Sequence, residues 1–152
     1  MGEQTHERIE IRATPAQCWA VAVDVAHYPD WAKDVKEAKV VDLDADGRPA
    51  RAEFRVAAMG RSIHYVLEYD YSDAPRSFGW KLVEGDMLRQ LDGSYSFEAD
   101  GDVTRVTYDL AVDITMPLPG LIKRRAAGLI TGNALKELKK AVERDSTVGR
   151  DS

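Results

Sequence analysis

The chain has very little cysteine: Cys18 is the only one among its 152 residues. A lone thiol forms no internal disulfide, and no second thiol is present to complete a zinc site. No stretch approaches the ~20 consecutive apolar residues of a membrane-spanning helix, and the polar residues 1–10 lack the apolar core of a signal peptide. We therefore expect a cytoplasmic protein that has no metal, no cofactor and no integral membrane segment.

Positive charge is also scarce. Lys and Arg number 21 against 26 Asp and Glu, which gives a formal net charge of −5 at pH 7. Binding to nucleic-acid phosphates needs a cationic face, so we expect no nucleic-acid partner. One basic run, 123–125, adjoins apolar Leu121 and Ile122. Either a solvated helix start or contact with an anionic lipid surface explains it.

Few side chains are arranged for catalysis. The histidines His6, His27 and His64 lack the spacing of metal ligands. Carboxylates gather around the turn at 84–86, where Asp and Glu are typically solvated. No nucleophile lies beside a base in the sequence, so an activated nucleophile is not indicated.

Alternation of apolar and polar residues dominates the middle of the chain. From residue 35 to 113 it has period two and is interrupted by turn sequences such as 44–47 and 100–102. This pattern predicts an antiparallel sheet with one wet and one covered face. Two short helices, at Thr14-Pro15 and at Tyr28-Pro29, precede it. Seven strands are predicted at 6–12, 35–43, 52–58, 62–71, 76–84, 89–97 and 103–113.

A long amphipathic helix is predicted from Leu121 to Arg144. It follows a Pro- and Gly-rich break at 117–120, and its apolar residues recur at steps of three and four. Its buried side is rich in small residues between 126 and 134, which either permit close packing against the sheet or leave a space. We expect a single domain over 1–145 and a disordered tail over 146–152.

The covered face of the sheet indicates a pocket. One helix cannot cover seven strongly curved strands, and the inward phase carries several tyrosines whose hydroxyls need partners. Such residues suit a mostly apolar ligand pocket with polar tips, or else a rim where the hydroxyls meet water. Arg89 falls in the same phase and either orients a keto or acidic group or reaches solvent. The predicted ligand-binding residues are Tyr65, Leu67, Tyr69, Phe78, Trp80, Arg89, Tyr95, Tyr108 and Leu129.

Several short motifs are spread along the chain. They are Thr14-Pro15-Ala16-x-x-Trp19, Tyr28-Pro29-Asp30-Trp31, Asp92-Gly93-Ser94-Tyr95, Thr104-x-Val106-Thr107-Tyr108 and Pro117-Leu118-Pro119-Gly120. Together, from about Thr5 to Arg144, the chain resembles the polyketide cyclase/dehydrase group of the START-like, Bet v 1-like (SRPBCC) superfamily. The resemblance implies an α+β helix-grip fold: a seven-stranded curved antiparallel sheet, two short helices and a long C-terminal helix that enclose a cavity.

The resemblance specifies the fold better than the reaction. The same scaffold hosts lipid carriers, hormone receptors, ubiquinone-binding proteins, oxygenase domains and cyclases, so fold analogy does not choose among them. Aromatase/cyclases of this group carry a pocket arginine where this chain has Tyr69, a tyrosine at the position of Val35 and a tryptophan at that of Ile63. The groups that would steer an aldol cyclisation are therefore absent. A catalytic role would rest on Tyr65, Tyr69, Tyr95, Tyr108 and Arg89.

Three functions follow as hypotheses. The first is a protein that binds a hydrophobic small molecule, lipid-, quinone- or polyketide-like, between the sheet and the C-terminal helix. The second is a polyketide cyclase or dehydratase that folds a poly-keto or aromatic substrate in the same cavity, mainly by holding it in a reactive geometry. The third is a protein-interaction module.

Overall fold

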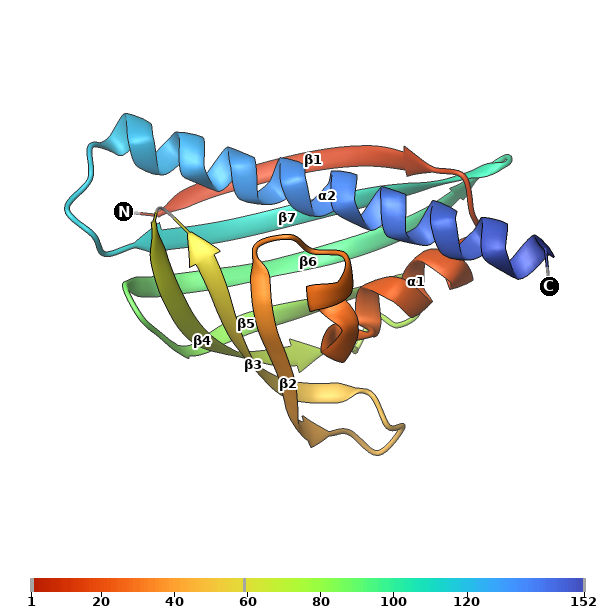
Figure 1. The fold of residues 1–152 in the computed structure, drawn as a ribbon, viewed down its shortest axis with the longest axis horizontal. Helices are drawn as coiled ribbons and strands as arrows, with labels where there is room; N and C mark the ends of the chain where they lie inside the picture. Colours follow the sequence, from red (N-terminus) through yellow and green to blue (C-terminus); the bar gives the residue numbers. More distant parts are fainter. Residues whose placement is uncertain (1, 59, 152) are drawn as a thin grey trace.

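The computed structural model describes residues 2–58 and 60–151, with side chains up to residue 144. Seven strands and three helices follow one another in the predicted order (Figure 1). Their bounds are β1 Glu3–Ile11, α1 Pro15–Val23, η1 Val25–Asp30, β2 Val35–Leu43, β3 Pro49–Ala58, β4 Arg61–Asp70, β5 Ser77–Gly85, β6 Leu88–Asp100, β7 Val103–Ile114 and α2 Gly120–Asp151.

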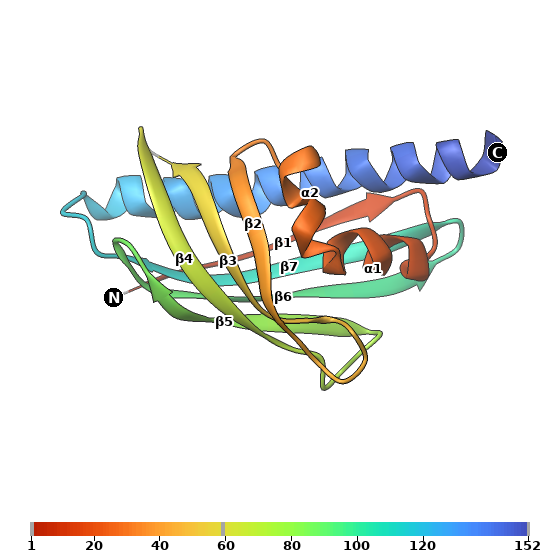
Figure 2. The ribbon, with the colours of Figure 1, turned by 60° about the horizontal axis from the view of Figure 1, so that its bottom comes forward.

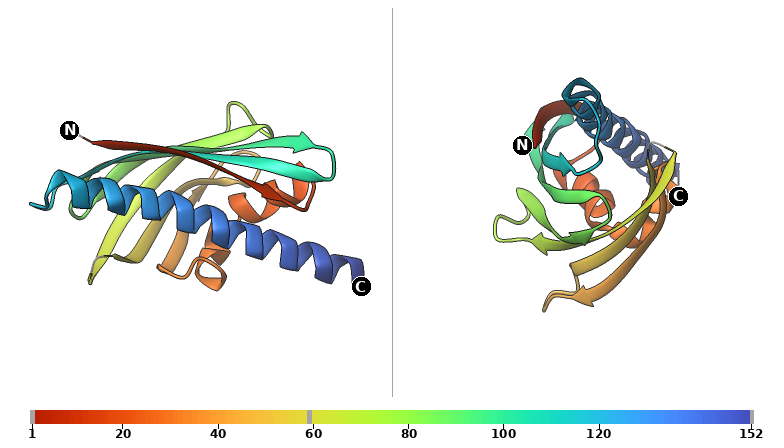
Figure 3. Two further views of the ribbon diagram at one scale, coloured as in Figure 1. Left: turned by 90° about the horizontal axis from the view of Figure 1, so that it is seen from above. Right: turned by 90° about the vertical axis from the view of Figure 1, so that its left-hand side faces the viewer.

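The strands form one antiparallel sheet in the order β1-β7-β6-β5-β4-β3-β2. Consecutive strands from β2 to β7 are neighbours, and β1 closes onto β7. The sheet is strongly curved, so β2, β3 and β4 cross the direction of β6 and β7 (Figure 2). Seen nearly along its axis, α2 lies across the concave side of this curve (Figure 3, right). The predicted α+β helix-grip fold is confirmed.

The first short helix, α1, closes one end of the concave face. Thr14 caps it: the Thr14 hydroxyl accepts from the Gln17 backbone N–H at 3.2 Å, while the Gln17 side chain accepts from the Thr14 N–H at 2.9 Å. From α1, Trp19 packs edge-on against Phe78 and Phe97, with ring centroids 5.3 and 5.8 Å apart. The second short helix, η1, is a 3-10 helix that begins at Val25.

The two halves of α2 have different environments. Leu135, Leu138 and Val142 in the C-terminal half are fully buried against β1, β7 and α1. In the N-terminal half Leu129 remains 58% exposed and Ile130 40% exposed, although both belong to the predicted buried stripe. Ala127 and Thr131 of the same half are fully buried, so this half is packed on one side and open beside Leu129 and Ile130.

The helical backbone of α2 extends to Asp151, beyond the predicted end at Arg144. The side chains of 145–151 and the whole of residue 152 lie outside the described residues. The predicted disorder of 146–152 and the single domain over 1–145 stay predictions. No described helix has an apolar stretch long enough to cross a bilayer.

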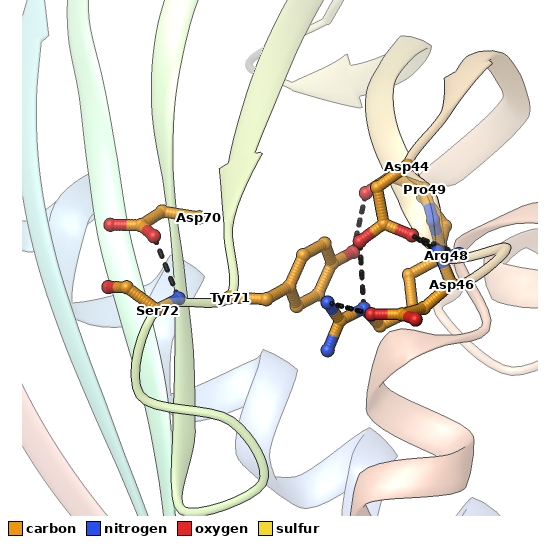
Figure 4. A network of polar contacts seen from close by, with 7 residues as sticks. All are labelled: Asp44, Asp46, Arg48, Pro49, Asp70, Tyr71 and Ser72. Carbon is orange, nitrogen blue, oxygen red and sulfur yellow. Dashed lines mark hydrogen bonds and ion pairs between the residues drawn. The ribbon is translucent and has the colours of Figure 1, made fainter.

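A polar cluster ties the end of β4 to the β2–β3 turn (Figure 4). The Tyr71 hydroxyl donates to the Pro49 carbonyl at 2.5 Å, and the Arg48 guanidinium lies 4.5 Å from the centre of the Tyr71 ring. Arg48 in turn donates to the carboxylates of Asp44 and Asp46 at 2.8 and 3.0 Å. This cluster links the end of β4 to the β2–β3 turn. The Tyr71 hydroxyl donates its proton within the fold and is not available to donate to a ligand.

Candidate ligand cavity

A cavity of about 440 Å³ lies between the concave face of the sheet and the N-terminal half of α2. Strands β3 to β7 supply its floor, η1 and the following loop supply one side, and Ala126, Leu129, Ile130 and Ala134 of α2 supply its roof. The small residues of α2 could either pack closely against the sheet or leave a space. Two of them, Ala126 and Ala134, line the cavity. The partly exposed Leu129 and Ile130 place a mouth along α2.

Seven of the nine predicted ligand-binding residues line this cavity. They are Tyr65, Leu67, Tyr69, Trp80, Tyr95, Tyr108 and Leu129. Alternation along β4 brings Tyr65, Leu67 and Tyr69 to one face, and Tyr95 is paired directly across the ladder with Tyr108. Val35 and Ile63 also line it.

Four of these residues, Tyr65, Tyr69, Tyr95 and Tyr108, are called the cavity tyrosines below. Tyr95 and Tyr108 meet edge to face with ring centroids 4.7 Å apart. Tyr28 and Tyr71 both donate to backbone carbonyls. By contrast, the hydroxyls of the cavity tyrosines make no hydrogen bond within the part of the chain that the structure describes. Their polar groups face the cavity and are free to meet a bound molecule.

The cavity tyrosines remain protonated at neutral pH. Burial raises the pKa of Tyr65 and of Tyr108 above the usual value of 10. Burial likewise raises the pKa of Tyr69 and Tyr95, and repulsion from neighbouring phenolates adds to it. Each hydroxyl is therefore a hydrogen-bond donor that also has acceptor capacity, and none serves as a base.

Two carboxylates line the opposite side of the cavity. Glu137 on α2 accepts a hydrogen bond from the Lys33 backbone N–H at 2.9 Å, which links the helix to the loop before β2. Asp34 in that loop also lines the cavity, as does the amide of Asn133. Within residues 2–58 and 60–144, no three His, Cys, Asp or Glu side chains are grouped so as to hold a metal ion.

Two aromatic residues of the cavity wall, Tyr28 and Trp31, were not among the predicted site residues. Their ring centroids lie 5.0 Å apart, and Tyr28 also lies 6.1 Å from Phe54. The Tyr28 hydroxyl donates to the Ala22 carbonyl, so this tyrosine is held by α1. The Tyr-Pro-Asp-Trp motif carried the family resemblance, and its aromatics were the signal that could have identified them.

Phe78, a predicted ligand-binding residue, does not line this cavity. Its side chain is only 2% exposed. Trp19 of α1 covers it at 5.3 Å, and Tyr95 and Phe97 flank it at 5.7 and 6.2 Å. The residue is on the concave face as expected, but it lies at the end that α1 closes, so its place is in the core.

Arg89 was also predicted to point inward, and it points outward. Its side chain is 72% exposed and pairs with Asp113 at 3.5 Å. The β6–β7 register shifts between Leu88 and Gln90, so Leu88 and Leu91 both face the cavity although they are three residues apart. This bulge changes the phase of the strand locally and moves the arginine to the outer face.

The Asp92-Gly93 pair shapes the wall between β5 and β6. A Cβ at Gly93 would lie 2.6 Å from the Trp80 ring and 2.7 Å from the Asp109 carbonyl oxygen, so only glycine lets the indole lie against the strand. The β5–β6 ladder ends at the Trp80–Gly93 pair, and beyond it the Asp92 carboxylate accepts from the Leu82 N–H at 3.0 Å. This side-chain contact keeps β5 joined to β6 beyond the end of their backbone ladder.

Comparison with known proteins identifies the fold and the family. Similar solved structures include a START superfamily protein from Mycobacterium smegmatis, 24% identical, with 93% of this chain and 97% of that chain covered and a TM-score of 0.86. A protein from Thermus thermophilus is also 24% identical, with coverage of 94% and 99% and a TM-score of 0.80. The Zhui aromatase/cyclase from Streptomyces sp. R1128 is 13% identical, with coverage of 95% for each chain and a TM-score of 0.78.

No curated protein sequence matches this chain. The family model described as polyketide cyclase / dehydrase and lipid transport matches residues 3–143, which include every strand and most of α2. The curved sheet, the long helix and the cavity between them agree with that match. The chain therefore belongs to the polyketide cyclase / dehydrase and lipid transport family and has a START-like fold.

Proposed function

We propose that this protein binds a hydrophobic small molecule, lipid-, quinone- or polyketide-like, in the cavity beneath α2. The observation that carries the proposal is the set of cavity tyrosines, whose hydroxyls have no partner within the described residues and face an apolar space of about 440 Å³. These hydroxyls open onto the cavity, where water is the alternative partner, so each hydrogen bond to a bound molecule contributes a net amount of about 0.5–1.5 kcal/mol. A bound molecule with oxygen atoms at suitable positions would gain this contribution from several of them together.

The surroundings of the hydroxyls also support a small-molecule site. Apolar and aromatic side chains, among them Leu67, Trp80 and Leu91, separate the polar groups, as is typical of pockets for drug-sized ligands. The mouth beside Leu129 and Ile130 offers a route of entry. The family's description includes lipid transport, which agrees with a carrier.

Binding is tested by native mass spectrometry of freshly purified protein, followed by solvent extraction and identification of any released compound. Titration with fatty acids, quinones and aromatic polyketides then measures affinity. A variant, Ala134→Trp, places an indole in the cavity roof, and Lys136→Trp places the same group on the exposed side of α2. We expect at least tenfold weaker binding for Ala134→Trp alone. Equal binding by both variants, or no binding by the wild type, would contradict the proposal.

A polyketide cyclase or dehydratase is the second candidate. Glu137 lies across the cavity from donors such as Tyr95, and its charge contributes to the raised pKa of that tyrosine. A carboxylate that removes a proton next to a ketone, with a tyrosine that donates to the ketone oxygen, suits an intramolecular condensation. Turnover that Glu137→Gln abolishes while binding persists would favour the enzyme. Recovery of the bound compound unchanged would favour the carrier.

A protein-interaction module is the third candidate. A stable complex with a protein partner, in which the cavity stays closed to every small molecule tested, would favour it over the other two. The predicted cytoplasmic location and the predicted absence of nucleic-acid binding stay predictions. Fractionation of the host cell and a nucleic-acid binding assay test them.

A further inference from the structure

The charges that line the cavity are all of one sign. Asp34 and Glu137 are the ionisable acids on its surface, and among the described residues that line it there is no Lys, Arg or His. Arg89, the one cation that the sequence pattern placed there, lies on the outer face with Asp113. The neutral hydrogen-bond donors that line it include the hydroxyls of the cavity tyrosines, the indole N–H groups of Trp31 and Trp80 and, at the exposed edge, the amide of Asn133.

This arrangement is unfavourable for an anionic ligand. A carboxylate or phosphate that left water for this cavity would lose its hydration without gaining a cation, and buried charges are costly unless they are paired. It would also be repelled by the carboxylates at the rim of the cavity, those of exposed Asp34 and half-buried Glu137. The net charge of −5 adds to the repulsion during approach.

The same arrangement suits uncharged oxygen-bearing ligands. Ketone, quinone or ester oxygens accept hydrogen bonds from tyrosine hydroxyls, and a hydroxyl on the ligand can donate to Glu137 or Asp34. Aromatic side chains such as Trp31, Trp80 and Tyr95 form much of the wall and favour stacked or edge-on contacts with flat rings. The tyrosine donors on the sheet and the carboxylate acceptors of Asp34 and Glu137 therefore both match a neutral ring system that carries oxygen atoms.

We propose that the cavity selects uncharged ligands that carry ketone, quinone, ester or hydroxyl oxygens, and that it rejects carboxylates and phosphates of the same size. This inference rests on the proposed binding function and specifies its ligand class. It excludes free fatty acids from the panel named above and retains quinones and neutral polyketides.

The experiment compares neutral and anionic compounds of matched size. The pairs are 2-acetylnaphthalene with 2-naphthoate, and hexadecanol with hexadecanoate, each titrated at pH 7.5 into wild-type protein. Tryptophan fluorescence reports binding because Trp31 and Trp80 line the cavity, and calorimetry checks the affinities. We expect the neutral member of at least one pair to bind, and to bind at least tenfold more tightly than its anionic partner.

Two variants test whether the cavity charge is the cause. Glu137→Gln removes one negative charge from the cavity, and the amide oxygen that replaces the carboxylate still accepts from the Lys33 N–H. It should reduce the neutral-to-anion affinity ratio severalfold. Glu98→Gln makes the same change in net charge on the exposed side of β6 and should leave the ratio at its wild-type value.

The outcomes separate this inference from the function on which it rests. An anion that binds as tightly as its neutral partner, or a ratio that falls equally in both variants, would overturn the selection of neutral ligands and leave ligand binding standing. Failure of all four compounds to bind would refute both proposals. A preserved ratio in Glu98→Gln together with a reduced ratio in Glu137→Gln would support both.

Discussion

Removal of one hydroxyl from the cavity should change stability and binding in opposite directions. Tyr95 is 5% exposed and its hydroxyl has no partner within the described residues. The hydroxyl opens onto the 440 Å³ cavity, so water can hydrate it when no ligand is bound, and its removal takes no hydrogen bond from the protein. For Tyr95→Phe without ligand we therefore expect a free energy of unfolding that is unchanged or higher by up to about 1 kcal/mol. That corresponds to a melting temperature 0 to about 4 °C higher.

The same substitution should weaken binding of a ligand that accepts from Tyr95. A neutral hydrogen bond contributes about 0.5–1.5 kcal/mol, which corresponds to roughly a twofold to tenfold rise in Kd. The matched control is Tyr71→Phe, which also removes one tyrosine hydroxyl. That hydroxyl donates to the Pro49 carbonyl at 2.5 Å, so the control should lose about 0.5–1.5 kcal/mol of stability and keep its affinity.

Both quantities are measured on the same preparations. Thermal unfolding followed by circular dichroism gives the stability of the ligand-free proteins, and titration with a neutral ligand gives Kd. A loss of stability in Tyr95→Phe equal to that in Tyr71→Phe would mean that the Tyr95 hydroxyl is already used in the empty fold. The proposed role of the cavity tyrosines in binding a ligand would then be refuted.

Three further predictions concern packing and titration. Gly93→Ala should lower the free energy of unfolding by about 1–3 kcal/mol because the new Cβ would lie 2.6 Å from the Trp80 ring. Gly128→Ala on α2 has open space around the new Cβ and should raise the free energy of unfolding by up to about 1 kcal/mol. Denaturant unfolding measures both. The cavity tyrosines have folded pKa values above their unfolded value of about 10, so their contribution to stability is complete below pH 10 and is lost as pH rises beyond it. Phenolate absorbance should consequently appear together with unfolding, and its appearance in a protein that keeps its native circular dichroism would contradict this. Burial raises the pKa of the Cys18 thiol to about 11, so a thiol reagent at pH 8 should label it only after denaturation, and rapid labelling of the native protein would count against the buried position.

Much of the cavity could be predicted because strand alternation assigns faces without knowledge of contacts. Tyr65, Leu67 and Tyr69 share one face of β4 whatever the position of the strand in the sheet. A single long helix cannot fill the concave face of seven curved strands, so a space between helix and sheet could also be expected. Prediction failed where the backbone departs from period two. Because of the register shift near Leu88, Leu88 and Leu91 face the cavity and Arg89 faces outward. The local sequence carries no signal for this shift comparable to the Gly and Asp residues that mark a turn.

The sequence by itself determined the order of the strands along the chain, most of their inward residues and the family, because side-chain periodicity and turn chemistry are local properties of the chain. The tertiary structure decided which inward residues are core and which are cavity wall. Phe78 and Tyr95 both face inward, yet α1 covers the first and leaves the second open to a space. It also decided the charge of that space, because the side on which Arg89 emerges depends on the register shift between β6 and β7, which exists only once the two strands are paired.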